Sequence, residues 1–103
     1  MFPDTFGTNE HYGGVNLKTS YTIFVNGGED VWTPASMVTL PDAEYAQKNE
    51  VYNLLADCAD CGHCGELRGP QDTDPKEMVA VRETISKTLH RWFNPQNAPT
   101  FLW

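Results

Sequence analysis

The three cysteines of this chain fall in one short segment, CADCGHC, at residues 58–64. Thiolates and imidazole nitrogens are ligands that zinc prefers, usually as a tetrahedral set of four. Cys58 and Cys61 lie one helical turn apart and can share an ion, and the glycine after Cys61 lets Cys64 fold back toward them. The segment therefore predicts a zinc ion (Zn) held by Cys58, Cys61, Cys64 and His63.

The fourth ligand is the weakest part of this prediction. His63 directly precedes Cys64, and adjacent residues rarely bind one tetrahedral ion without strain. His11, Asp60 or Asp72 could complete the set instead. With every position filled by protein, no coordination site is left open, so the zinc would be structural and not catalytic.

Two redox interpretations of the same segment stay open. The C-x2-C-x2-C spacing resembles part of a bacterial ferredoxin run but lacks the fourth cysteine. A Cys58–Cys61 or Cys61–Cys64 pair would form a C-x-x-C redox motif. The alternative without chemistry is that the cysteines are small buried hydrophobic residues. An odd number of cysteines excludes a closed set of disulfides within one chain.

Motifs for enzyme catalysis are missing from the sequence. There is no G-x-S-x-G, no P-loop and no G-x-G-x-x-G before a helix. None of the histidines, His11, His63 and His90, has an evident serine or cysteine partner outside the cysteine segment. We therefore expect a chain that is not an enzyme, although it could be a non-catalytic subunit of one.

Composition narrows the class of partner. The chain has 103 residues, 40% of them hydrophobic, and a formal net charge of -7, which fits one folded acidic domain. This charge argues against direct binding to nucleic acid or to a membrane surface. No apolar run is long enough to span a bilayer, and residues 1–7 do not resemble a signal peptide. We expect a cytoplasmic protein, or one of the host cytoplasm or virion if it is viral.

The elements that position the cysteines predict an α+β fold in a single domain. Residues 1–14 have no periodicity and predict an irregular arm. Residues 15–39 alternate between apolar and polar side chains on either side of a glycine-rich turn, which predicts a β-hairpin.

Residues 40–93 predict a long antiparallel αα-hairpin. The first helix is predicted to begin at Thr39, whose hydroxyl would cap it, followed by Pro41 in the first turn and the carboxylate of Asp42. A second capping sequence at Asp74 begins the other helix. The cysteine-rich segment then forms the connecting loop. Residues 94–103 are an apolar tail.

Aromatic side chains at the end of the chain suggest a protein contact, because such residues anchor many interfaces. We therefore predict a small interaction or assembly subunit that binds a protein partner or forms a homo-oligomer. The predicted contact residues are Trp92, Phe93, Phe101, Leu102 and Trp103. One alternative is an acidic, possibly phage-encoded inhibitor that imitates nucleic acid and blocks a nucleic-acid-binding protein. Another is an iron–sulfur or thiol redox accessory subunit.

Overall fold

The computed structural model describes residues 2–94 and residue 96. Three helices and two strands follow one another along this part of the chain: α1 (Thr5–Tyr12), β1 (Thr22–Gly27), α2 (Ala43–Lys48), β2 (Val51–Ala56) and α3 (Lys76–Phe93). Short 3-10 turns interrupt the connections: η1 (Gly14–Asn16), η2 (Thr33–Ala35) and η3 (Gly65–Leu67).

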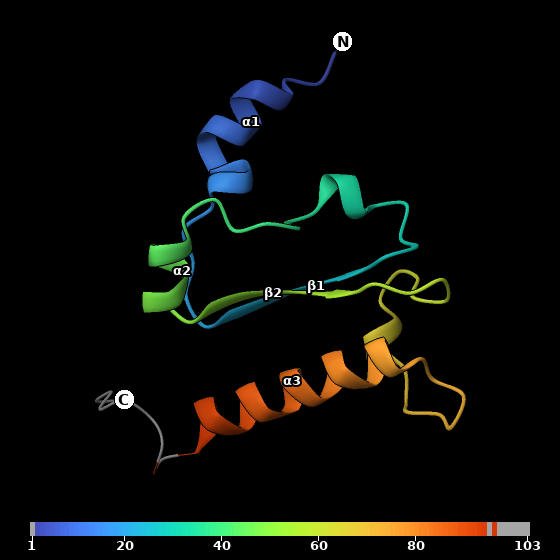
Figure 1. The fold of residues 1–103 in the computed structure, drawn as a ribbon. Coiled ribbons are helices and arrows are strands. Elements are labelled where there is room, and N and C mark those ends of the chain that lie inside the picture. Colours follow the sequence, from blue (N-terminus) through green and yellow to red (C-terminus); the bar gives the residue numbers. More distant parts are fainter. Residues whose placement is uncertain (1, 95, 97–103) are drawn as a thin grey trace.

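The two strands form a parallel sheet, in register from Thr22 opposite Val51 to Gly27 opposite Ala56. The crossover between them carries η2 and α2, and α3 packs on the other side of the strands (Figure 1). Because the strands are parallel, both carboxyl ends lie at the same edge of the sheet. The loops that leave this edge are residues 28–32 and 57–64, so the fold brings these two segments together.

The core lies at the same end of the molecule. Four buried side chains form it: Ala56 from the end of β2, Cys61 from the following loop, and Met78 and Val81 from α3. Cys61 is completely buried. The loop after β2 is therefore anchored by one of its own side chains in the core.

The predicted αα-hairpin is wrong, although the mixed α+β class holds. The predicted first helix begins at a Thr39 cap, but the carboxylate of Asp42 caps α2 instead, and α2 ends at Lys48. Glu50 then adopts a left-handed backbone with φ 57°, a conformation that cannot continue a helix. The apolar run that follows becomes β2, because periodicity alone does not separate a buried helix face from a strand buried on both faces.

The predicted β-hairpin at 15–39 is also wrong. Its first strand exists as β1, but the partner strand is β2 and the pairing is parallel. Pro34 falls within the turn η2, where its missing N–H interrupts no ladder. The arm predicted as irregular contains α1. The second predicted helix is confirmed as α3, which ends directly before Asn94.

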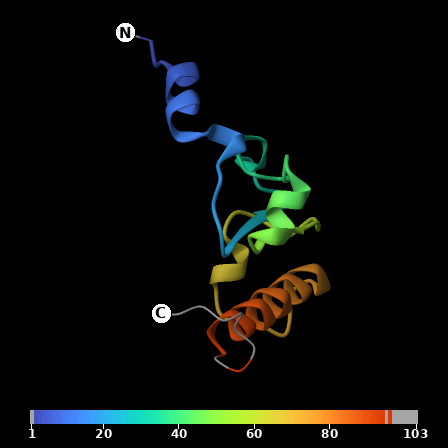
Figure 2. The same ribbon diagram turned by 90° about the vertical axis from the view of Figure 1, so that its left-hand side faces the viewer.

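Helix α1 lies apart from the sheet and α3 in both ribbon views (Figure 1, Figure 2). Its first turn is capped by Asp4, whose carboxylate accepts the N–H of Gly7 at 2.8 Å, yet α1 has no buried residue. Among the described helices, none combines the length and apolarity that crossing a membrane requires.

Candidate functional site

A histidine and an aspartate meet where the two strand-end loops converge. The Nδ1 atom of His63 lies 2.7 Å from Oδ2 of Asp30. Asp30 follows β1 and His63 follows β2, so the parallel pairing alone brings them to one edge of the sheet. The Asp30 side chain is only 5% exposed, whereas that of His63 is 61% exposed. The pair therefore has a buried carboxylate and an accessible imidazole.

Both carboxylate oxygens of Asp30 are engaged. Oδ1 accepts the backbone N–H of Trp32 at 2.9 Å, while Oδ2 faces the ring of His63. The hydrogen bond from His63, followed by that from Trp32, holds the pKa of Asp30 below its usual value. Asp30 therefore stays ionised at neutral pH and acts as an acceptor only. An acceptor at Nδ1 places the ring proton on that nitrogen and leaves Nε2 of neutral His63 as a base.

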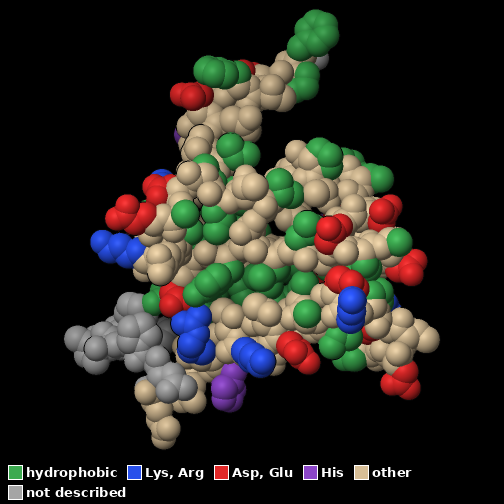
Figure 3. All heavy atoms as spheres, viewed as in Figure 1, with side chains coloured by type: hydrophobic (Ala, Val, Ile, Leu, Met, Phe, Trp, Pro, Cys, Tyr) green, Lys and Arg blue, Asp and Glu red, His purple; other side chains and the backbone are tan. Residues whose placement is uncertain are grey.

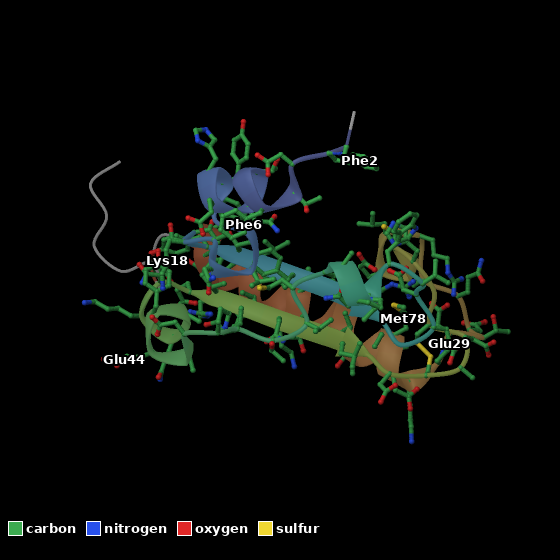
Figure 4. The ribbon with its side chains drawn as sticks, turned by 90° about the horizontal axis from the view of Figure 1, so that it is seen from above. Phe2, Phe6, Lys18, Glu29, Glu44 and Met78 are labelled. Atoms are coloured by element: carbon green, nitrogen blue, oxygen red, sulfur yellow. A yellow bond between two sulfur atoms is a disulfide. The ribbon has the colours of Figure 1, made fainter. Side chains whose placement is uncertain are left out.

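Backbone contacts tie the two loops to each other directly behind this pair. The N–H of Gly28 donates to the carbonyl of Ala56 at 2.8 Å, and the N–H of Glu29 donates to the carbonyl of Cys61 at 3.0 Å. The disulfide and the labelled Glu29 and Met78 lie at the same end of the molecule in Figure 4. The hydrogen bond between Glu29 and Cys61 joins the residue before Asp30 to a residue two positions before His63. The loops therefore hold Asp30 and His63 in one relative position.

Gly27 lets the loops approach this closely. A Cβ atom at this position would collide with the backbone carbonyl oxygens of Cys61 and Gly62. Gly27→Ala is therefore expected to lower the free energy of unfolding by about 2 kcal/mol, because backbone must move to admit a methyl group. Urea unfolding of the two proteins measures the difference.

Gly69→Ala is the matched control, because a Cβ at Gly69 meets no atom within 4 Å. Its denaturation midpoint should stay close to that of the original chain. Equal midpoints for Gly27→Ala and Gly69→Ala would contradict the close approach of the two loops.

The cysteine segment takes a different arrangement from the predicted zinc site. Cys58 and Cys61 form a disulfide, and Cys64 is a free, exposed thiol. His63 pairs with Asp30. Across the described residues, no three His, Cys, Asp or Glu side chains gather as a metal-binding group. Because zinc binds thiolates and not disulfide sulfurs, this arrangement does not bring the four predicted ligands together, and zinc binding stays a prediction from the sequence.

Thiol counting distinguishes the disulfide from the zinc site. The chain has three cysteines, of which Cys64 alone is free. We expect a chromogenic thiol reagent to detect one thiol per chain in denaturant with a chelator, and three after reduction and removal of the reductant. Three thiols before reduction would contradict the disulfide and leave all three cysteines available as zinc ligands.

The chain beyond His63 is held by an arginine from α3. Arg82 donates to the carbonyl of Gly65 at 2.9 Å and to that of Glu66 at 3.3 Å. It also pairs with the carboxylate of Asp74, which is 1% exposed and lies 2.7 Å from Arg68 through its other oxygen. These ion pairs fasten η3 and the following loop to the helix.

The predicted partner-binding residues fall into two groups. Trp92 is half-buried: its ring meets Tyr21 edge-on and its indole N–H donates to Glu50 at 3.2 Å. Phe93 is 75% exposed. Phe101, Leu102 and Trp103 lie outside the described residues. Their role in binding a partner stays a prediction.

Comparison with known proteins gives one informative match. No family model and no solved structure matches the chain. Over 69 residues, or 67% of its length, it is 33% identical to the probable serine protease EDA2 of Arabidopsis thaliana, of which it covers 13%. The chain thus corresponds to a small part of that protein. The similarity overturns the expectation that the chain is not an enzyme, but a match to 13% of that protein does not by itself support an enzyme activity.

Proposed function

We propose that this chain supplies the histidine and the carboxylate of a serine-hydrolase site that cleaves peptide or ester bonds. The observation that carries the proposal is the 2.7 Å contact between Nδ1 of His63 and Oδ2 of Asp30. The partial similarity to a probable serine protease agrees with this class of site, but it covers 13% of that protein and does not locate the site. In a Ser-His-Asp site, a buried carboxylate orients an imidazole whose other nitrogen faces the nucleophile.

The order of the two residues along the chain also supports the proposal. Asp30 comes first, after β1, and His63 follows, after the neighbouring parallel strand β2. The α/β-hydrolases place their carboxylate and histidine in this order, with the nucleophile earlier in the chain.

The pair would act as a general base and then as a general acid. Nε2 of His63 takes the proton of the attacking hydroxyl as the oxygen bonds to the substrate carbonyl carbon. The ring then carries a positive charge, which the ionised Asp30 stabilises through the Nδ1 hydrogen bond. The same proton is returned from Nε2 to the leaving group when the scissile bond breaks.

No described contact places a serine of this chain near His63 to act as the nucleophile of such a site. The serines of this chain are Ser20, Ser36 and Ser86, and within the described residues no hydrogen bond joins any of them to His63. Ser20 precedes β1, about 20 Å from the carboxyl end of a six-residue strand. We therefore assign the attacking hydroxyl to further residues of a longer polypeptide or to a partner chain.

The surface around the pair fits a site completed by additional protein. Val31 and Trp32, directly after Asp30, are 84% and 63% exposed. Parallel sheets are normally buried on both faces and contain more than two strands, whereas the described sheet has only β1 and β2. Figure 3 shows hydrophobic side chains gathered along the middle of one face, between the level of the sheet and α3. Added strands would cover such surface.

An active-site label tests this proposal. Fluorophosphonates react with a serine only when a neighbouring base activates it. The protein that carries this sequence, purified with any chain that accompanies it, should be labelled on a serine outside residues 1–103. Peptide mapping identifies the position. The absence of a labelled serine, in a preparation where a known serine hydrolase is labelled, would contradict the proposal.

The functions predicted from sequence are not tested by these observations. A protein-interaction subunit with a partner or a second copy, an acidic inhibitor and a redox accessory subunit remain predictions. The first is compatible with the present proposal, because a site completed by another chain is itself a protein contact.

A further inference from the structure

Two anchors hold the loop that carries His63. Behind it, Cys61 fills the core between Ala56, Met78 and Val81 and is completely buried. Ahead of it, Arg82 binds the carbonyls of Gly65 and Glu66. His63 is exposed between these anchors, so its ring position depends on how firmly each of them is fixed.

The rear anchor is a closed ring. The disulfide joins Cys58 to Cys61, and the N–H of Cys61 also donates to the carbonyl of Cys58 at 3.2 Å. The carbonyl of Cys61 accepts from Glu29, the residue before Asp30. Cys61 therefore contacts the core, the loop that carries Asp30 and, through the disulfide, Cys58 at the start of the loop that carries His63.

Without the cross-link the loop would be held much less closely. The nearest sheet residue before His63 is Ala56, which ends β2 and accepts from Gly28. If Cys61 left the core, seven residue steps would separate Ala56 from His63, whereas the anchored Cys61 is two residue steps away. Longer free segments sample more conformations, and ordering each residue costs about 1–2 kcal/mol of conformational entropy.

We propose that the Cys58–Cys61 disulfide is a positioning element for His63, which keeps its Nδ1 against Asp30 and makes the pair sensitive to dithiol reductants. The inference rests on the proposed function for its catalytic meaning, but the positioning itself is measurable in this chain alone. In the reduction, a dithiol gives two electrons and two protons to the disulfide. The bond between the two sulfurs breaks, Cys58 and Cys61 become thiols, and the reductant closes into its own disulfide.

The test reads the protonation of the imidazole nitrogens by NMR in the full chain. Cys64→Ser serves as the background, because it removes the free thiol that could exchange with the disulfide. His11 and His90 are both exposed and serve as internal references in the same spectra. In the oxidised protein we expect His63 to carry its proton on Nδ1, with a resolved Nδ1–H resonance.

Reduction with dithiothreitol should remove that resonance and return the tautomer ratio of His63 to that of the two reference histidines. The amide resonances of β1 and β2 should stay in place. Cys58→Ala in the same background should show the reduced pattern before any reductant is added.

Each outcome decides a different question. An Nδ1–H resonance that survives reduction and Cys58→Ala overturns the positioning inference and leaves the proposed function standing. Collapse of the β1 and β2 amide resonances also overturns it, because the disulfide would then stabilise the whole domain and not the histidine. If oxidised His63 already matches the references and Asp30→Asn changes nothing, the pairing itself is absent and the proposed function fails with it.

Discussion

His63→Ala is expected to lower kcat for peptide or ester hydrolysis about 10⁶-fold, in the protein that carries both this sequence and the nucleophile. The loss is large because the imidazole performs both proton transfers, and removing it disables the nucleophile along with the base. KM should change far less, since His63 stabilises the transition state and contributes little to ground-state binding. Steady-state kinetics on a chromogenic ester measures both constants.

Asp30→Asn should have a smaller effect, about 10⁴-fold in kcat. The amide keeps the shape of the side chain but removes the charge, so it neither holds the ring proton on Nδ1 nor stabilises the imidazolium. The hydrogen bonds from His63 and Trp32 keep the pKa of the Asp30 carboxyl low. The substitution therefore also removes an ionised acceptor for both of these groups. The ranking of the two variants, with the histidine the larger, is part of the prediction.

Two exposed positions provide matched controls for these variants. His90 lies near the end of α3, and Asp60 lies three residues before His63 in the same loop. His90→Ala and Asp60→Asn make the same chemical changes away from the pair. All four variants should retain the circular dichroism of the original. A His63→Ala protein that keeps full kcat, or a loss as large in His90→Ala, would contradict the assignment.

The sequence predicts those parts of the fold in which local signals agree. Helix α3 has an apolar stripe and a stop, and its extent agrees closely with the prediction, although Pro75 and not Asp74 is its N-cap. The prediction of a helix at residues 51–56 is wrong because the apolar run there suits a helix face as well as a strand. Its choice depends on pairing with β1, a contact between distant residues that a local pattern does not contain.

The candidate site illustrates the same limit. His63 is noticed in the sequence, but as a zinc ligand, because the neighbouring cysteines dominate the local pattern. Asp30 is missed, since a glycine pair followed by acidic residues also describes an ordinary turn. Only the parallel pairing of β1 with β2 puts the two loops at one edge. An aspartate directly after a strand and a histidine after the next one are the available signal, but it requires the correct strands.

At the opposite end of the sheet, an ion pair between Glu50 and Arg91 contributes to the pH dependence of stability. Glu50 lies just before β2, and its carboxylate accepts hydrogen bonds from the two terminal guanidinium nitrogens of Arg91 at 2.8 and 2.9 Å. It also accepts from the hydroxyl of Tyr52 and the indole N–H of Trp92. These bonds, with that from Arg91 the largest, lower the pKa of Glu50 from 4.5 to about 2. They join the end of α3 to the start of β2, so they contribute to folding.

Acidification should therefore remove this contribution in a defined window. The folded state binds the proton on Glu50 less readily than the unfolded chain does, so the stabilisation is fully present above about pH 5 and is lost as the pH falls toward 2. The shift corresponds to about 2–3 kcal/mol after allowance for a side chain that is 24% exposed. Urea unfolding at pH 7, 4 and 2.5 measures it.

The variant Glu50→Gln isolates this contribution from the titration of the other carboxylates. At pH 7 it should be less stable than the original chain by about 2–3 kcal/mol, and the difference should shrink toward zero near pH 2 as Glu50 itself becomes protonated. Glu83→Gln, at an exposed position of α3 without an ion pair among the described residues, should run parallel to the original at every pH. A constant gap between Glu50→Gln and the original from pH 7 to 2.5 would mean that the charge of Glu50 is not what stabilises the end of α3.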